Sequence, residues 1–535
     1  MCSTFNMAKL TLAVQQVHML KIIILCCAIH NTNSAKILTY PYAQGFNSRM
    51  MNMEKMAVIL SENSHDVSII SSSKYKAVER PIKDITVYQF SVPNDTMLLT
   101  DQAVLNTILD EGVSPLEVMN VIGKLHVTFC EGLLIDKALL DTLKRSNFDM
   151  LIMDVAEPNA WILAHYLDVP IVLYANEGAY TDVPFGGLGQ VVPYSFVPHT
   201  FSPFSDEMNI WERFQNVLLN VGIQLYVWKT FSSISKIRNK YNINVTVDIS
   251  EQNIQSTALI LSNDHFAFDY PRPLLPNHIY IGGLYYSPPK SLPDHMEALM
   301  QNSGEKGVII VAFGSTQHQM LNIKLIEIMA EVFAALPQTV IWKYSGASLK
   351  RLGENTHVFS WIPQNDLVGH QKTKLFVTHC GVSSTYESLL HGVPVVAIPI
   401  GVDQFHHALQ LTNRAKTGVQ IKKDFTNEEL KSSITSVLGN DTYLKNAKYV
   451  SELMHDNPIP PKDTLLYWID YVARHKGADH LKSKGMNQLN ILQYFLLDIV
   501  GFIILVMFSF LSLIFFFCKL CICKYCNFRK KQKSD

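Results

Sequence analysis

The sequence has almost no net charge and few cysteines outside its two ends. Its 45 lysines and arginines are balanced by 46 acidic residues, a formal charge of -1 over 535 residues. This balance leaves no basic footprint, so nucleic acid is excluded as the expected partner. Of nine cysteines, only Cys130 and Cys380 lie in the middle of the chain. No disulfide framework is implied, and the C-terminal cysteines lack the second, distant pair of a zinc site, so no metal is expected.

Internal repeats and low-complexity tracts are also missing, and the chain alternates between strand and helix patterns. The chain is too long for a single domain, and its 48% apolar content can fill two cores. Short apolar runs typical of parallel strands occur in the first half as KILTYP, DVSIIS, FDMLIMD and VPIVLYA, with a helical stretch at 50–60. A second series follows as GVIIVAFGS, TVIWKY, HVFSWIP, LFVTHCG and VPVVAIP, after a proline-rich linker at 271–293. We therefore expect an α/β protein with two halves.

The two ends predict a membrane topology. Residues 1–35 read as a signal peptide, whose form is better if translation begins at Met19. Residues 499–517 are an uncharged run of about 19 residues, enough for one crossing within a predicted transmembrane helix at 498–517. The basic tail at 518–535 places the C-terminus in the cytoplasm and the rest of the chain in the lumen. Its Lys531 and Lys533 match a dilysine signal for retrieval to the endoplasmic reticulum, although a plain stop-transfer tail is the alternative. Asn94, Asn244 and Asn440 are predicted glycosylation sites.

The segment 361–404 carries the strongest functional pattern. LFVT is a strand that leads through His379, Cys380 and Gly381 into a helix pattern containing Glu387. The free N–H groups and the dipole at a helix N-terminus favour a diphosphate, and glycine allows close approach to the backbone. A carboxylate one turn into the helix can accept both hydroxyls of a ribose. A second strand, VVAIP, leads to Asp403, and ligands of open α/β sheets lie at such carboxyl ends.

Together, in this order, these residues resemble the donor-binding signature of the UDP-glycosyltransferases, the family that includes UDP-glucuronosyltransferases and ceramide galactosyltransferase. The resemblance implies a GT-B fold: two Rossmann-like domains facing a cleft, with an acceptor-binding domain at 36–285 and a UDP-sugar-binding domain at 286–475. A membrane-proximal segment at 476–497 would precede the membrane helix. The resemblance also implies a role for each motif position. Trp361 would stack on uracil, and Gln364 would contact the nucleoside. His379, Gly381 and Ser384 would hold the diphosphate, with Gly314 and Ser315 beside the phosphates. Glu387 would bind the ribose, and Asp403 and Gln404 would bind the transferred sugar.

Three positions depart from the family pattern. Cys380 stands where a second glycine is usual, and Ser383 stands where a longer asparagine reaches the donor. The third departure concerns catalysis, because family members use a histidine base held by an aspartate. Asp154 matches that aspartate, but Arg49 occupies the position of the histidine. A guanidinium stays protonated at physiological pH and cannot accept a proton.

The expected function is membrane-bound, inverting transfer of a hexose or glucuronate from a UDP-sugar to a small lipophilic acceptor, without a metal cofactor. Three interpretations of Arg49 remain open. Transfer proceeds through Asp154 or the acceptor's own nucleophilicity; the protein binds a UDP-sugar with weak or absent catalysis; or the register of this loop is different. The donor sugar is not fixed, although Gln404 argues mildly against galactose. A homo-oligomer is a further expected partner.

Overall fold

The computed structural model describes residues 34–42, 44, 47–75, 85–99, 101, 104, 115–176, 192–243, 257–314, 322–346, 349, 351–483, 485–486 and 489–531. The chain falls into two compact units, Met1–Leu481 and Lys482–Asp535. Residues 1–33 of the predicted signal peptide lie outside the described residues.

A seven-stranded parallel sheet forms the core of the first half of the larger unit. Its strand order is β3-β2-β1-β4-β5-β6-β7. The central strands are buried on both faces, which explains their nearly continuous apolar sequences. The strand predictions at KILTYP, DVSIIS, FDMLIMD and VPIVLYA are confirmed. The strands are β1 (Lys36–Tyr40), β2 (Asp66–Ser72), β3 (Thr86–Phe90), β4 (Met150–Asp154), β5 (Ile171–Ala175), β6 (Thr257–Ser262) and β7 (His278–Tyr280).

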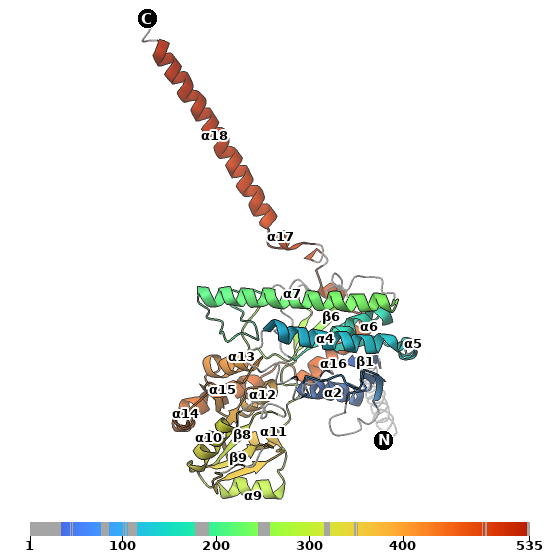
Figure 1. Cartoon of the computed structure of the whole chain (residues 1–535), viewed down its shortest axis with the longest axis vertical. Coiled ribbons are helices and arrows are strands. Elements are labelled where there is room, and N and C mark those ends of the chain that lie inside the picture. Colours follow the sequence, from blue (N-terminus) through green and yellow to red (C-terminus); the bar gives the residue numbers. More distant parts are fainter. Residues whose placement is uncertain are drawn as a thin grey trace, which may run out of the picture. The chain divides into compact units, whose positions relative to one another are not determined.

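Helices cover both faces of this first sheet (Figure 1). One face packs against α4 (Pro115–Ile135), α5 (Lys137–Arg145), α6 (Asn159–Leu167) and α7 (Ile210–Lys240). The other face packs against α2 (Asn47–Glu62) and α16 (Pro461–His475). Helix α7 begins at a capping box, in which the Asn209 side chain accepts from the backbone of Glu212 and the Glu212 side chain accepts from that of Asn209.

A six-stranded parallel sheet forms the second half, in the order β10-β9-β8-β11-β12-β13. The five strands predicted here are confirmed, and β13 was not predicted. The strands are β8 (Val308–Ala312), β9 (Thr339–Lys343), β10 (Thr356–Phe359), β11 (Thr373–Thr378), β12 (Val395–Ala397) and β13 (Gly418–Gln420).

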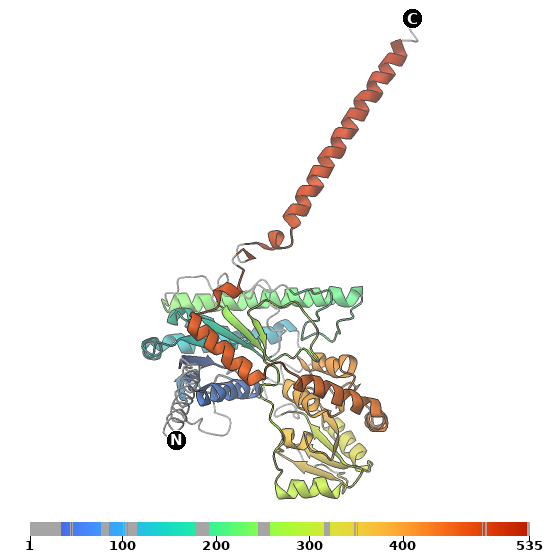
Figure 2. The same cartoon turned by 180° about the vertical axis from the view of Figure 1, so that it is seen from behind.

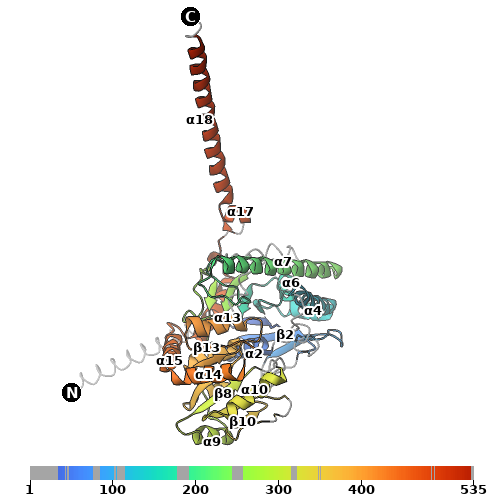
Figure 3. The ribbon, with the colours of Figure 1, turned by 60° about the vertical axis from the view of Figure 1, so that its left-hand side comes forward.

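Two layers of helices cover the second sheet as well (Figure 3). One layer packs through α10 (Ile323–Ala334) and α14 (Asn427–Gly439). The other packs through α9 (Asp294–Asn302), α11 (Gln364–Val368), α12 (Val382–His391) and α15 (Asp441–His455). Short helices α13 (Gln404–Leu409) and η3 (Gln410–Arg414) connect β12 to β13.

The division of the larger unit is less simple than its sequence suggests. Strand β7 lies inside the predicted linker at 271–293, yet it pairs with β6 and completes the first sheet. Helix α16 follows the second sheet in sequence but lies with the first half (Figure 2). Its Leu465, Ile469 and Val472 are buried in the core of the first sheet. Residues 461–475 therefore belong structurally with the first half, because their apolar face fits the open side of that sheet.

The smaller unit contains α17 (Ile491–Tyr494) and α18 (Leu497–Lys531). Residues Leu497–Lys524 have a mean hydropathy of 2.9, and none of this apolar stretch is buried against the rest of the protein. Helix α18 is therefore long and apolar enough to cross a membrane. It contains the predicted span at 498–517. Among the described residues, Glu117–Ile135 of α4 passes the same test of length and composition, but Phe129 and Leu133 are buried in the first core, as in a core helix of a soluble domain.

Candidate functional site

The turn between β11 and α12 forms an open helix N-terminus at the carboxyl edge of the second sheet. Gly381 is the N-cap residue, and no side chain there accepts from the first backbone N–H groups. These groups suit an anion. Cys380 has φ of 63°, the left-handed region that favours glycine. This conformation explains why a glycine is usual at that position, and Cys380 adopts it with a fully buried side chain.

The imidazole of His379 lies between two glycines. A Cβ atom added to Gly381 would lie 2.7 Å from His379 Nε2, and one added to Gly314 would lie 3.0 Å away. Gly314 also has φ of +74°, so a larger residue would be strained there in any case. Burial lowers the pKa of His379 to about 4, although Asp403 acts in the opposite direction. The ring is therefore neutral at physiological pH and can donate one hydrogen bond.

Helix α11 and helix α12 are joined by a small polar network. The Gln364 side-chain amide donates to Ser384 Oγ at 3.0 Å and to Glu387 Oε2 at 2.6 Å. Burial raises the pKa of Glu387 to about 7, opposed first by the hydrogen bond from Gln364. Trp361, just before α11, leaves 59% of its surface exposed and so offers a free aromatic face. Ser383 is exposed on the first turn of α12.

The loop after β12 is fixed by Gln404. Its side-chain oxygen accepts from the N–H groups of Ile400 at 2.8 Å and Gly401 at 3.2 Å, and the residue is buried. Asp403, with 22% of its side chain exposed, lies 4.0 Å from His407 Nδ1. Gln404 thus holds the loop in place, while the Asp403 carboxylate stays accessible.

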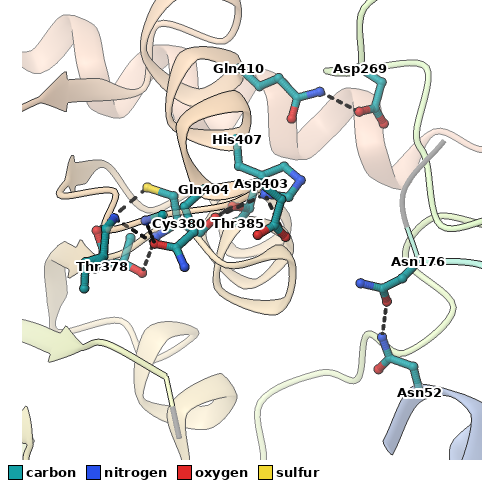
Figure 4. Close-up of polar contacts among 12 residues, drawn as sticks. Asn52, Asn176, Asp269, Thr378, Cys380, Thr385, Asp403, Gln404, His407 and Gln410 are labelled. Carbon is teal, nitrogen blue, oxygen red and sulfur yellow. Dashed lines mark hydrogen bonds and ion pairs between the residues drawn. The ribbon is translucent and has the colours of Figure 1, made fainter. Parts of the chain in front are cut away.

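His407 ties this loop to the β11–α12 turn (Figure 4). Its Nδ1 lies 3.2 Å from the carbonyl oxygen of Cys380, which also accepts from Thr385 Oγ1 at 3.4 Å. Burial lowers the pKa of His407, and the neighbouring Asp403 raises it. His407 was not predicted from the sequence, where its position one helical turn after Asp403 was the available signal.

In the first half, Arg49 and Asp154 form a buried, two-point ion pair. Arg49 Nε donates to Asp154 Oδ2 at 2.9 Å, and Nη2 donates to Oδ1 at 2.6 Å. Asp154 Oδ1 also accepts from the Ala156 N–H at 2.8 Å. The two side chains are 6% and 0% exposed. Arg49 comes from the first turn of α2 and Asp154 from the end of β4, so the fold brings together two positions that are 105 residues apart.

Direct hydrogen bonds join the two halves beside the site. Tyr386 on α12 donates its hydroxyl to the Asn263 carbonyl at 2.6 Å. Gln410 Nε2 donates to Asp269 Oδ1 at 2.7 Å (Figure 4). Burial, and then the Asp264 carboxylate, raise the pKa of Asp269 above its ordinary value. A cleft here is lined by residues that include Asp264, Asp269, Arg272, Thr385, His406 and His407, none of which was predicted as a site residue.

The remaining predicted positions are scattered. Ser315 and Asn244 lie outside the described residues. Asn94 is exposed in a turn, and Asn440 is exposed at the N-cap of α15, where its side chain accepts from the Thr442 N–H at 3.0 Å. Within the described part of the chain, no three His, Cys, Asp or Glu side chains gather as metal ligands.

Two parallel sheets, each covered by helices on both faces and joined in this way, form the GT-B fold seen in solved glycosyltransferases. The calicheamicin glycosyltransferase CalG4 superposes with a TM-score of 0.59 at 15% identity, covering 82% of this chain and 99% of that one. A UDP-glucose:anthocyanidin 3-O-glucosyltransferase in complex with UDP superposes with a TM-score of 0.57 at 15% identity, covering 83% of this chain and all of that one.

The chain belongs to the family described as UDP-glucoronosyl and UDP-glucosyl transferase, whose sequence model matches residues 35–534. It is 30% identical over 543 residues to UDP-glucuronosyltransferase 2B1 of Rattus norvegicus, covering 98% of this chain and 100% of the relative. It is 29% identical over 531 residues to UDP-glucuronosyltransferase 2B17 of Homo sapiens, covering 96% and 98%. The protein is therefore a UDP-glycosyltransferase.

Proposed function

We propose that the protein is a membrane-anchored, inverting enzyme that transfers a hexose or glucuronate from a UDP-sugar to a small lipophilic acceptor. The observation that carries this proposal is the network of Gln364, Ser384 and Glu387 beside His379 at the open start of α12. A carboxylate, a neutral imidazole and backbone N–H groups within one strand-turn-helix segment supply the chemistry that a ribose and a diphosphate require, which supports the proposal. No metal is needed, because these donors can stabilise the leaving diphosphate.

Each donor-site residue has a proposed role, and for the described residues this role matches the environment of the side chain. The exposed ring of Trp361 stacks on uracil, and Gln364 contacts the nucleoside. His379, Ser384 and the backbone at Gly314 and Gly381 hold the diphosphate, with Ser315 and Ser383 at its margin. Glu387 accepts from the ribose hydroxyls. Asp403 contacts the transferred sugar, and Gln404 contributes chiefly by holding its loop.

The ion pair between Arg49 and Asp154 supports the alternative of weak catalysis. Both oxygens of Asp154 accept hydrogen bonds from the guanidinium, and Arg49 itself has no lone pair to accept a proton. We propose that acceptors which need little base assistance, such as amines, react fastest. Removal of a general base costs about a hundred- to ten-thousandfold in rate, so slow transfer to hydroxyl acceptors remains compatible with the pair.

Donor transfer is tested with the detergent-solubilised full chain and a panel of labelled UDP-sugars and acceptors. An active transferase forms product and loses this on Asp403→Ala, while Asp424→Ala, at an exposed turn, keeps parental activity. Stabilisation against heat by UDP without any product would instead support the binding-only alternative. If UDP gives no stabilisation and no product forms, donor binding is refuted.

The proposal that Arg49 weakens catalysis is tested with Arg49→His and, as its control, Arg49→Gln. We expect Arg49→His to raise transfer to hydroxyl acceptors, because an imidazole beside Asp154 can accept the proton, whereas Arg49→Gln should not. Unchanged or lower rates with Arg49→His across phenol and lipid acceptors, in a protein that still binds UDP, would contradict the role proposed for this position.

The proposed location is the endoplasmic-reticulum membrane, with α18 as the single span, the larger unit in the lumen and the basic tail in the cytoplasm. The uncharged run of α18 and the lysines after it support this orientation. Glycosylation at Asn94, Asn244 or Asn440, removable by endoglycosidase, is expected in intact microsomes. Proteolysis of the larger unit in sealed microsomes would contradict the luminal assignment.

A further inference from the structure

Helix α7 exposes a continuous row of large apolar side chains. At about 100° per residue, the eight members fall within about one third of the helix circumference. Trp211, Leu225 and Trp228 leave 62%, 62% and 66% of their surfaces exposed. We call this row the α7 apolar stripe; its members are Ile210, Trp211, Phe214, Val217, Leu218, Val221, Leu225 and Trp228.

The opposite, buried side of the same part of α7 is polar. Asn216 is buried, and its Nδ2 donates to the carbonyls of Tyr194 and Val197 while its Oδ1 accepts from the His199 N–H. Asn220 is also buried and donates to the Asn216 carbonyl. Rotating the helix to bury the stripe would break the three bonds that Asn216 makes outside the helix and leave those buried polar groups unsatisfied. The hydrogen bonds therefore fix the apolar side chains on the outside, the reverse of a surface helix in a soluble domain.

The charges along α7 indicate what covers the stripe. The 15 residues from 214 to 228 carry no charge, and Lys229, Lys236, Arg238 and Lys240 follow toward the C-terminal end. An apolar face bounded by tryptophan, with cations beyond it, is typical of a helix that lies in a lipid headgroup layer. A contiguous apolar surface of this kind is rarely left in water.

We propose that the α7 apolar stripe docks on the surface of a phospholipid bilayer, in the same membrane that α18 crosses. The proposal rests on the membrane anchor of the proposed function. The 15 residues from 482 to 496 join the larger unit to α18 and can extend about 50 Å at most. This short tether keeps the stripe within reach of the bilayer that α18 crosses, and the eight apolar side chains supply the binding.

The test uses the full chain, reconstituted in vesicles of phosphatidylcholine and phosphatidylserine, with a protease site inserted after Gly485. Cleavage separates the folded larger unit from α18, and vesicle flotation measures how much of it stays bound. We expect the parent fragment to remain with the vesicles. We expect Leu218→Ser/Leu225→Ser to partition at least about tenfold less, because two half-exposed leucines together equal one full leucine burial. The control Ile323→Ser/Leu444→Ser, on exposed apolar residues elsewhere, should partition like the parent.

Each other outcome would overturn the proposal. Release of the parent fragment as a monomer shows that the stripe does not bind lipid, and release by 1 M salt shows that cations alone hold it. A released dimer that the double serine variant abolishes assigns the stripe to a second copy of this chain. Extraction of the uncleaved chain from the vesicles by alkali would refute the membrane anchor α18 as well. Heat stabilisation by UDP tests the donor site separately from both membrane proposals.

Discussion

Replacing Arg49 with methionine is expected to destabilise the first half of the protein strongly. The substitution keeps most of the side-chain volume but removes both hydrogen bonds to Asp154, at 2.9 and 2.6 Å. Asp154 is fully buried, and its remaining backbone partner is the Ala156 N–H. Breaking a buried ion pair from one side costs about 3–5 kcal/mol, because the other charge stays buried without its partner. At about 2 °C per kcal/mol for a domain of this size, the melting temperature should fall by about 6–10 °C.

The assay is thermal unfolding of the detergent-solubilised chain, with two comparison variants. Arg351→Met removes an exposed pair, 3.9 Å from Glu331, and should change the free energy of unfolding by less than about 0.5 kcal/mol. Arg49→Met/Asp154→Asn removes the uncompensated charge and should recover part of the loss. A loss below about 1 kcal/mol for Arg49→Met, or no recovery in the double variant, would refute the reasoning that the pair is buried and mutually dependent.

Three further predictions concern the donor site. Affinity for a UDP-sugar should rise about tenfold from pH 6 to pH 8, a range in which the diphosphate stays ionised. The reason is that the pKa of Glu387 is raised to about 7, and the ionised carboxylate accepts hydrogen bonds from the ribose hydroxyls. Calorimetry should show this rise for the parent protein and no such rise for Glu387→Gln. Without ligand, the same raised pKa means that stability falls as pH rises from about 4.5 to 7. Gly381→Ala should weaken binding at least about tenfold by displacing His379, whereas Gly439→Ala, with open space around it, should bind normally; equal affinities would contradict this. Trp361→Ala should cost about 1–3 kcal/mol of UDP binding through lost stacking, and an unchanged dissociation constant would exclude the stack.

The sequence was sufficient for the elements that are built from neighbouring residues. The β11–α12–β12 unit was predictable because strand, turn and helix signals occur in order within one short segment, and glycine punctuates both ends of α12. The left-handed conformation of Cys380 is the local exception. A cysteine gives no sign of positive φ, so only the resemblance to a glycine position indicated it.

Contacts between distant segments were not predictable from the same signals. Tyr386 bonds to a carbonyl 123 residues earlier, and Gln410 bonds to Asp269 across 141 residues. Such pairs depend on how the two sheets meet, and periodicity within one segment carries no information about that. Strand β7 was missed for a different reason: it has three residues and follows prolines, so its sequence resembles a linker.

The packing of α16 on the first sheet determines how this protein can be recombined with its relatives. The chain passes from the first half to the second after β7 and returns to the first half at α16. A chimera with one junction near residue 285 would seat a foreign α16 on the native first sheet, where Leu465, Ile469 and Val472 fill the core. Exchange of the first half between relatives therefore requires two junctions, one after β7 and one before Pro461, so that α16 stays with the sheet that it covers.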